Sequence, residues 1–275
     1  MKTSPFPRGW MWAGLALAVI GWVAFLLITP GGVLRKTDYV AAAVCHRRPE
    51  HSFFVGDQQL PLCQRCSGTF PGALTGLLVQ WLLWRRRRSL RFPDWRMLLL
   101  MAALAAPWAL DGVNSFTSEL PWREVGVGIL GYAPQPWLRL LTGILMGAAM
   151  SVFLVPAFNQ TMWADGVAEP TIRSWHELAL LLAIELAVGA AIYLAEPFLL
   201  YPVAIYSALA VVAMFTCLGA MIFVMALARD GTLHSWRAAW VPLAWGLVFA
   251  LLIIGGMDFV RFQLMGTIDG MPGIS

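Results

Sequence analysis

The stretch PWLRLLTGILMGAAMSVFLVPA (Pro136–Ala157) carries a single charged residue, Arg139, within a run of apolar and small side chains. A helix of this length crosses a hydrocarbon core of about 30 Å. The glycines and alanines of its central part, TGILMGAAMS, have the spacing that lets a second helix approach closely. The stretch therefore predicts a membrane-spanning helix that packs tightly against a neighbour.

The rest of the chain repeats this pattern. Hydrophobic residues make up 59% of the 275 residues and charged residues 12%, which is about half the charged share of a soluble domain. We therefore expect an all-α, polytopic membrane protein in which residues 1–275 form a single membrane domain with about seven transmembrane helices. The predicted spans are 9–29, 67–84, 95–112, 136–157, 175–196, 199–228 and 237–257.

Four consecutive arginines, Arg85–Arg88, decide the predicted orientation. Short loops rich in arginine stay on the cytoplasmic side. We therefore expect a multi-pass protein of the cell membrane with its N-terminus in the cytoplasm and the polar segment 30–66 outside. The arginine run suits the anionic surface of a lipid bilayer. The loop that contains it is short, so we do not expect nucleic acid as a partner.

The polar segment 30–66 gathers soft metal ligands. Cys45, Cys63 and Cys66 lie within twenty-two residues, and His46 and His51 lie beside the first of them. Two residues between a pair of cysteines let both sulfurs reach one ion at about 2.3 Å. Cys45 then supplies a third ligand and one of the histidines a fourth, although adjacent ligands such as Cys45 and His46 are awkward for a single ion. The pattern predicts a zinc-like site.

Two other functions fit the same cysteines. Cys63 and Cys66 can form a small disulfide ring that is readily reduced, as in a membrane thiol–disulfide oxidoreductase or electron-transfer component. The arginines beside them favour thiolates, because a nearby cation lowers a thiol pKa; they are Arg47, Arg48 and Arg65. Alternatively, the chain is an accessory subunit of a larger membrane complex that docks through this segment. The sequence leaves open whether the protein is an enzyme.

The segment resembles the signature of an uncharacterised family of bacterial and archaeal multi-pass membrane proteins. That family carries C-H-x-x-P-E-R-S-F followed by P-L-C-x-R-C-x-G-x-Y-x-G. The matching residues here are Cys45, His46, Pro49, Glu50, Ser52, Phe53, Pro61, Leu62, Cys63, Arg65, Cys66, Gly68 and Gly72. His51 stands where the family has arginine, and Phe70 where it has tyrosine. The resemblance implies His46, rather than His51, as the family-like ligand.

A second block is similar to the family's D-G-x-x-Q, followed later by R-x-x-T-G. Its matches are Asp111, Gly112, Arg139, Thr142 and Gly143, and Ser115 replaces the glutamine. The resemblance covers a core of about 45–160 and implies a site without naming a reaction.

Three ionisable residues within the predicted spans are candidates for pocket chemistry, because such groups at membrane depth usually face a partner or a cavity. Asp111 and Arg139 both fall at the outer ends of their helices, and we expect them to form an ion pair. Glu185 falls near mid-bilayer, where it either makes a structural hydrogen bond or binds a proton or a cation.

Overall fold

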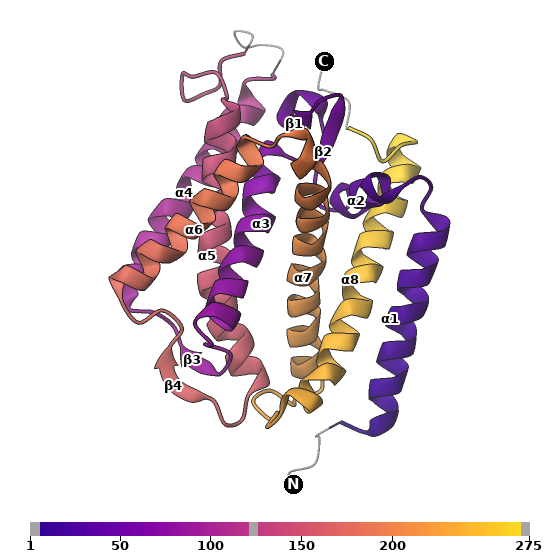
Figure 1. Ribbon diagram of the computed structural model, residues 1–275, viewed down its shortest axis with the longest axis vertical. Coiled ribbons are helices and arrows are strands. Elements are labelled where there is room, and N and C mark those ends of the chain that lie inside the picture. The colour runs from indigo at the N-terminus through magenta and orange to yellow at the C-terminus, as the bar shows by residue number, and fades with distance from the viewer. Residues whose placement is uncertain (1–5, 121–125, 271–275) are drawn as a thin grey trace.

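The computed structural model describes residues 6–120 and 126–270, most of them in long helices that run side by side (Figure 1). Within those residues, six helical segments have the length and hydrophobicity of a membrane span: α1 (Arg8–Ile28), α4 (Trp95–Thr117), α5 (Pro136–Met162), α6 (Trp175–Tyr193), Pro197–Ala226, of which Leu200–Ala226 is α7, and α8 (Trp236–Met265). Large apolar side chains remain exposed along them, which lipid rather than water would cover.

The remaining predicted span, 67–84, corresponds to α3 (Gln64–Leu78), which continues into a π-helical turn, Val79–Leu83. Most residues of α3 are buried, because the helix lies inside the bundle and contacts α5, α6 and α7. The prediction of a helical membrane protein is therefore confirmed, and the six candidate spans together with α3 are consistent with about seven helices.

Glycines set the distance between α3 and α5, as the small residues of α5 predict. A Cβ atom added to Gly143 would lie 2.2 Å from the carbonyl oxygen of Arg65, and one added to Gly68 would lie 2.4 Å from that of Leu140. Both separations are too short for any side chain. The backbones of α3 and α5 therefore touch directly, and this contact fixes the helix that carries Cys66.

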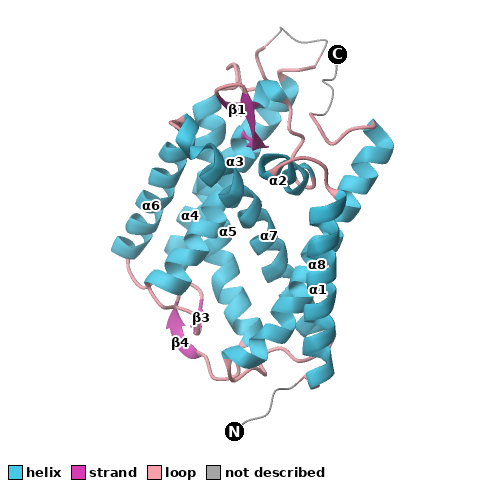
Figure 2. Cartoon of the chain, turned by 45° about the vertical axis from the view of Figure 1, so that its right-hand side comes forward, coloured by secondary structure: helices cyan, strands magenta, loops and turns pink. Residues whose placement is uncertain are grey.

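The polar segment 30–66, which contains none of the predicted spans in full, folds into a cap at one end of the bundle. It contains α2 (Val33–Ala42), a 3-10 turn (Pro49–His51) and the antiparallel strands β1 (Ser52–Val55) and β2 (Gln58–Cys63). The helix α2 packs against α7 and α8 toward the same end of the bundle as the hairpin (Figure 2). The strand β2 leads directly into α3, so the hairpin orients the start of that helix.

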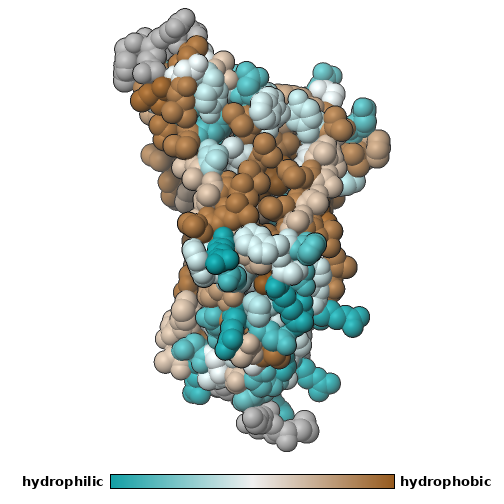
Figure 3. Space-filling model, turned by 90° about the vertical axis from the view of Figure 1, so that its left-hand side faces the viewer, coloured by the Kyte–Doolittle hydropathy of each residue, from teal (hydrophilic) through white to brown (hydrophobic). Residues whose placement is uncertain are grey.

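The opposite end carries the arginine run. There the short parallel strands β3 (Ser89–Arg91) and β4 (Val167–Pro170) pair, far from the β1–β2 hairpin (Figure 1). Two ion pairs of 2.9 Å hold the run in place, one between Arg86 and Glu177 and one between Arg88 and Asp165. An apolar zone covers the face formed by α4 and α6, with hydrophilic residues gathered toward the β3–β4 end (Figure 3).

The cysteines and the arginine run thus lie at opposite ends of the molecule, as the predicted orientation requires. Which of the two ends faces the cytoplasm remains a prediction.

Candidate metal centre

The three cysteines of the cap converge on one point. The Sγ atoms of Cys45, Cys63 and Cys66 all lie within 4.8 Å of one another. In a tetrahedral site with sulfurs at about 2.3 Å from the ion, neighbouring sulfurs are about 3.8 Å apart, so a small contraction would close this group around one ion. All three cysteines are free thiols in the structure.

Local folding explains the convergence. Cys63 ends β2 and caps the N-terminus of α3, while Cys66 lies in the first turn of that helix. Cys45 follows α2 and is brought alongside by the cap, where the backbone N–H of Cys63 donates a hydrogen bond of 3.2 Å to its sulfur. The spacing of two residues therefore places two sulfurs on one helix end, and the third arrives from a separate element.

The three thiols differ in the direction in which their pKa values are shifted. Hydrogen bonds from Cys45 and Cys66 hold the pKa of the Cys63 thiol well below its usual range. The hydrogen bond with Cys63 raises the pKa of Cys45. The lowered pKa favours the thiolate at Cys63, and a thiolate is the form of cysteine that binds metal or attacks a disulfide.

His46 extends the cluster, and His51 lies behind it. The Nδ1 atom of His46 is 4.0 Å from the Cys45 sulfur, and its Nε2 atom is 3.0 Å from Nδ1 of His51. The Nε2 atom of His51 is in turn 2.8 Å from a carboxylate oxygen of Glu119. Burial lowers the pKa of His51 to about 3, so this imidazole is neutral at neutral pH.

A neutral His51 fixes which atom donates and which accepts in the hydrogen bonds that link His46, His51 and Glu119. Glu119 accepts the N–H of His51 at Nε2, which leaves Nδ1 of His51 as an acceptor for the Nε2–H of His46. The Nδ1 atom of His46 then carries a lone pair that faces the sulfurs. A histidine ligand held through its other nitrogen is the usual arrangement at a metal.

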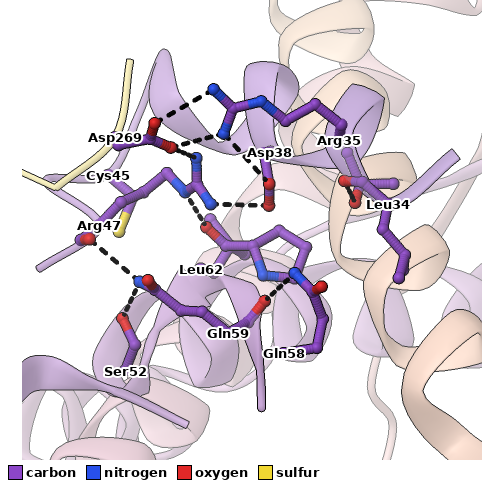
Figure 4. Close-up of polar contacts among 12 residues, drawn as sticks. Leu34, Arg35, Asp38, Cys45, Arg47, Ser52, Gln58, Gln59, Leu62 and Asp269 are labelled. Carbon is purple, nitrogen blue, oxygen red and sulfur yellow. Dashed lines mark hydrogen bonds and ion pairs between the residues drawn. The ribbon is translucent and has the colours of Figure 1, made fainter. Parts of the chain in front are cut away.

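Two buried arginines hold the backbone of the ligand segment. Arg261 at the end of α8 donates to the carbonyl oxygens of Ala42, Cys45 and His46, at 2.9, 2.6 and 3.0 Å. Arg47 adopts a positive φ of 52°, and its guanidinium lies between Asp38, at 2.7 Å, and Asp269, at 3.7 Å (Figure 4). The turn at Arg47 changes the direction of the backbone directly after Cys45 and His46, the two adjacent candidate ligands.

The arginines next to the cysteines are neutralised by carboxylates rather than by thiolates, contrary to the expectation from the sequence. Arg47 pairs with Asp38, Arg48 with Glu119, and Arg65 with Asp111. The thiol that is most acidic owes its low pKa first to the other two thiols.

The predicted ion pair between Asp111 and Arg139 is wrong. The Oδ2 atom of Asp111 lies 2.5 Å from the guanidinium of Arg65, and its Oδ1 atom accepts a hydrogen bond of 3.0 Å from Tyr132. Arg139 instead contacts Ser115 Oγ and Gln64 Oε1, both at 3.3 Å. The first turn of α3 brings Arg65 next to Gly112, so that Arg65 reaches Asp111 first.

Arg139 is therefore a buried cation with no carboxylate within ion-pair distance among the described residues, although it lies within electrostatic range of Cys63. Glu185 lies elsewhere, buried near the middle of α6. The polar group beside the cysteines consists of Gln64, Arg65, Asp111, Ser115, Tyr132 and Arg139.

Sequence reasoning missed several residues that support the centre. Glu119 and Arg261 are far from the cysteines along the chain, and only the fold brings them near. Asp38 lies in the polar segment 30–66, and its role depends on α2, a ten-residue helix that is not among the predicted spans. No local signal in the sequence identifies these three partners.

Comparisons with known proteins agree with the resemblance drawn from the cysteine signature. Residues 45–153 match a family described as Predicted membrane protein (DUF2085). An uncharacterized protein of Methanocaldococcus jannaschii is 25% identical over 124 residues, which cover 45% of this chain and 69% of that protein. An uncharacterized protein of Methanothermobacter thermautotrophicus is 29% identical over 109 residues, covering 40% and 82%. No solved structure matches the chain. The resemblance to an uncharacterised membrane-protein family is thus confirmed.

Proposed function

We propose that this integral membrane protein binds one zinc ion at the end of its helical bundle, through Cys45, Cys63, Cys66 and His46. The observation that carries the proposal is the convergence of three sulfurs within 4.8 Å. Thiolates and imidazole are the ligands that zinc prefers, and a set of three cysteines and one histidine is a common structural zinc site.

The adjacent His46 is the better fourth ligand than His51. Its Nδ1 atom already faces the sulfurs, whereas His51 has one nitrogen facing His46 and the other facing Glu119. His51 and Glu119 therefore act as supports that fix the tautomer and the ring orientation of His46.

The charge of the surroundings supports a metal–thiolate group. A divalent ion with three thiolates and one neutral imidazole carries a single negative charge. Arg139 supplies a buried positive charge that no described carboxylate contacts. An uncompensated buried charge is costly, and a thiolate site would balance this one.

A closed set of four ligands suits a site that organises structure rather than one that activates water. The ion would join α2 and the ligand segment to the start of α3, and so hold the cap over the polar group around Arg65 and Arg139. Without His46 as a ligand, the fourth position would be open to water, and the site would be suited to catalysis.

Substitution with Co²⁺ tests the ligand set, because tetrahedral cobalt–thiolate sites absorb strongly in the visible and near ultraviolet. We expect Cys45→Ser, Cys63→Ser and Cys66→Ser each to weaken the sulfur-to-cobalt charge-transfer bands. Cys217→Ser, in the middle of α7, is the matched control and should leave the spectrum unchanged. A wild-type spectrum without thiolate bands, or bands that survive each of the three substitutions, contradicts the proposal.

The thiol–disulfide function has one observation in its favour, the low pKa of Cys63 beside Cys66. Such a function requires these two residues to cycle between a disulfide and two thiols. Alkylation of the purified protein before and after reduction distinguishes it from a metal site, since a bound metal protects thiols until a chelator removes it.

A further inference from the structure

A second unusual site lies within the membrane-spanning part of the bundle. Glu185 is near the middle of α6 and its side chain is fully buried. It points toward α3: a Cβ atom added to Gly76 would lie 2.6 Å from Oε1, and one added to Gly72 would lie 3.6 Å from Oε2. The two glycines thus leave the space that the carboxyl group occupies. Gly76 is ten residues beyond Cys66, which places this site about 15 Å along α3 from the cysteines.

The neighbouring hydrogen-bond donors are all used elsewhere. The hydroxyl of Ser151 donates to the carbonyl oxygen of Ala148 at 2.8 Å, and the amide of Gln80 donates to Gly76 O at 3.2 Å and to Ser151 Oγ at 3.3 Å. Thr75 donates to Pro71 O at 2.8 Å, so the hydroxyl of Tyr206 donates to Thr75 at 2.7 Å.

What remains around Glu185 is an excess of acceptors. Neither of its carboxyl oxygens has a hydrogen-bond partner among the described residues, and the Oε1 atom of Gln80 lacks one too. Among the described residues, no lysine or arginine forms an ion pair with Glu185. The titratable group within electrostatic range of Glu185 is Tyr206 of α7. A bare carboxylate in such surroundings is prohibitively costly.

We propose that Glu185 binds a monovalent cation, either a proton or a sodium ion, in a site separate from the cysteine centre. The ligand chemistry follows from the donor count: the two carboxyl oxygens of Glu185 have no donor left to satisfy them among the described residues, so they need a positive charge. Ser151 contributes a further oxygen, because its Oγ atom and Oε1 of Glu185 both lie next to the same Gly76 position.

The test compares wild-type protein with Glu185→Gln, which removes the charge and keeps the size of the side chain. Glu196→Gln is the matched control, since Glu196 is an exposed acid just beyond the end of α6. Two quantities are measured in detergent: the infrared carbonyl stretch of protonated carboxyl groups, and the thermal midpoint as a function of pH and of Na⁺, with choline keeping the ionic strength constant.

If the cation is a proton, the wild type shows a carboxyl band at neutral pH that Glu185→Gln lacks and Glu196→Gln retains. The stability of the wild type then falls relative to that of Glu185→Gln as the pH rises, because the unfolded chain releases this proton at lower pH than the folded one does. Sodium has no effect in that case.

If the cation is sodium, Na⁺ raises the thermal midpoint of the wild type and of Glu196→Gln but not that of Glu185→Gln, because a ligand that binds only the folded state stabilises it. Equal carboxyl bands together with equal responses to pH and Na⁺ in wild type and Glu185→Gln overturn the proposal. Should Glu185→Gln fail to fold, Glu185→Leu provides the same comparison with an apolar side chain. The cysteine site is intact in all of these proteins.

Discussion

His51 shows how a residue that does not touch the ion can decide whether the ion binds. It lies between the Nε2 atom of His46 and the carboxylate of Glu119. Without it, the His46 ring loses the acceptor that fixes its tautomer, while the three sulfurs keep their positions.

We therefore expect His51→Ala to weaken zinc binding about 10–100-fold without abolishing it. His46→Ala should weaken it more, because a ligand is lost. Competition with a chromogenic chelator measures both affinities. Equal losses for the two variants would make His51 a ligand, and an unchanged affinity in His51→Ala would remove it from the site.

The ion pair of Asp111 gives a second test at this scale, since Asp111 is buried and pairs with Arg65 rather than with Arg139. We expect Asp111→Asn and Arg65→Gln each to destabilise the protein by up to about 3 kcal/mol. Their double variant should lose clearly less than the sum of the two, because both remove the same pair.

Asp111→Asn with Arg139→Gln is the comparison cycle for that experiment, measured by thermal unfolding in detergent. Arg139 lies close enough to Asp111 to interact electrostatically but makes no direct contact with it. Its coupling to Asp111 should be the smaller of the two. The reverse order would restore the ion pair expected from the sequence.

The elements of the bundle depend on the direct contact between α3 and α5. Gly143→Ala places a Cβ atom 2.2 Å from the carbonyl oxygen of Arg65. We expect a loss of about 1–3 kcal/mol from overpacking, and a weaker metal affinity because the start of α3 shifts. Gly255→Ala in α8 is the control, since nothing lies within 4 Å of its added Cβ. If both variants behave alike, the close approach of α3 and α5 is not important.

At this scale the sequence predicts the long helices well and the cap poorly. A span such as α5 is recognisable because lipid requires a long apolar run with its backbone hydrogen bonds satisfied internally. The cap does not cross the lipid, so its sequence needs no long apolar run. The elements α2, β1 and β2 are short and mixed in polarity, and they become stable only by packing on α7, α8 and one another.

The candidate ligands could be identified from their spacing, because Cys63 and Cys66 are two residues apart and Cys45 adjoins His46. The residues that support these ligands could not be identified in this way. Arg65 was expected to act on the thiols, but its side chain reaches Asp111, and that choice depends on the rotation of α3 about its axis. Glu119 and Arg261 meet the cysteine segment only through the packing of whole helices.

For the whole molecule, the two ends of the bundle carry different chemistry, and the predicted topology assigns them to opposite sides of the membrane. A reporter active only in the cytoplasm should therefore be active when fused in the Arg85–Arg88 run and inactive when fused at Gly56, the turn between β1 and β2. The reverse result inverts the topology and places the cysteines in a reducing compartment, which would weaken the thiol–disulfide alternative.

The central claim is that the three thiols and His46 hold a metal ion. Elemental analysis of the purified wild-type protein, prepared without chelator, tests this most directly. We predict about one zinc per chain in the wild type and in Cys217→Ser, and its loss in Cys63→Ser. Wild-type protein that carries no metal, and whose Cys63 and Cys66 resist alkylation until they are reduced, would contradict the metal centre and establish a disulfide in its place.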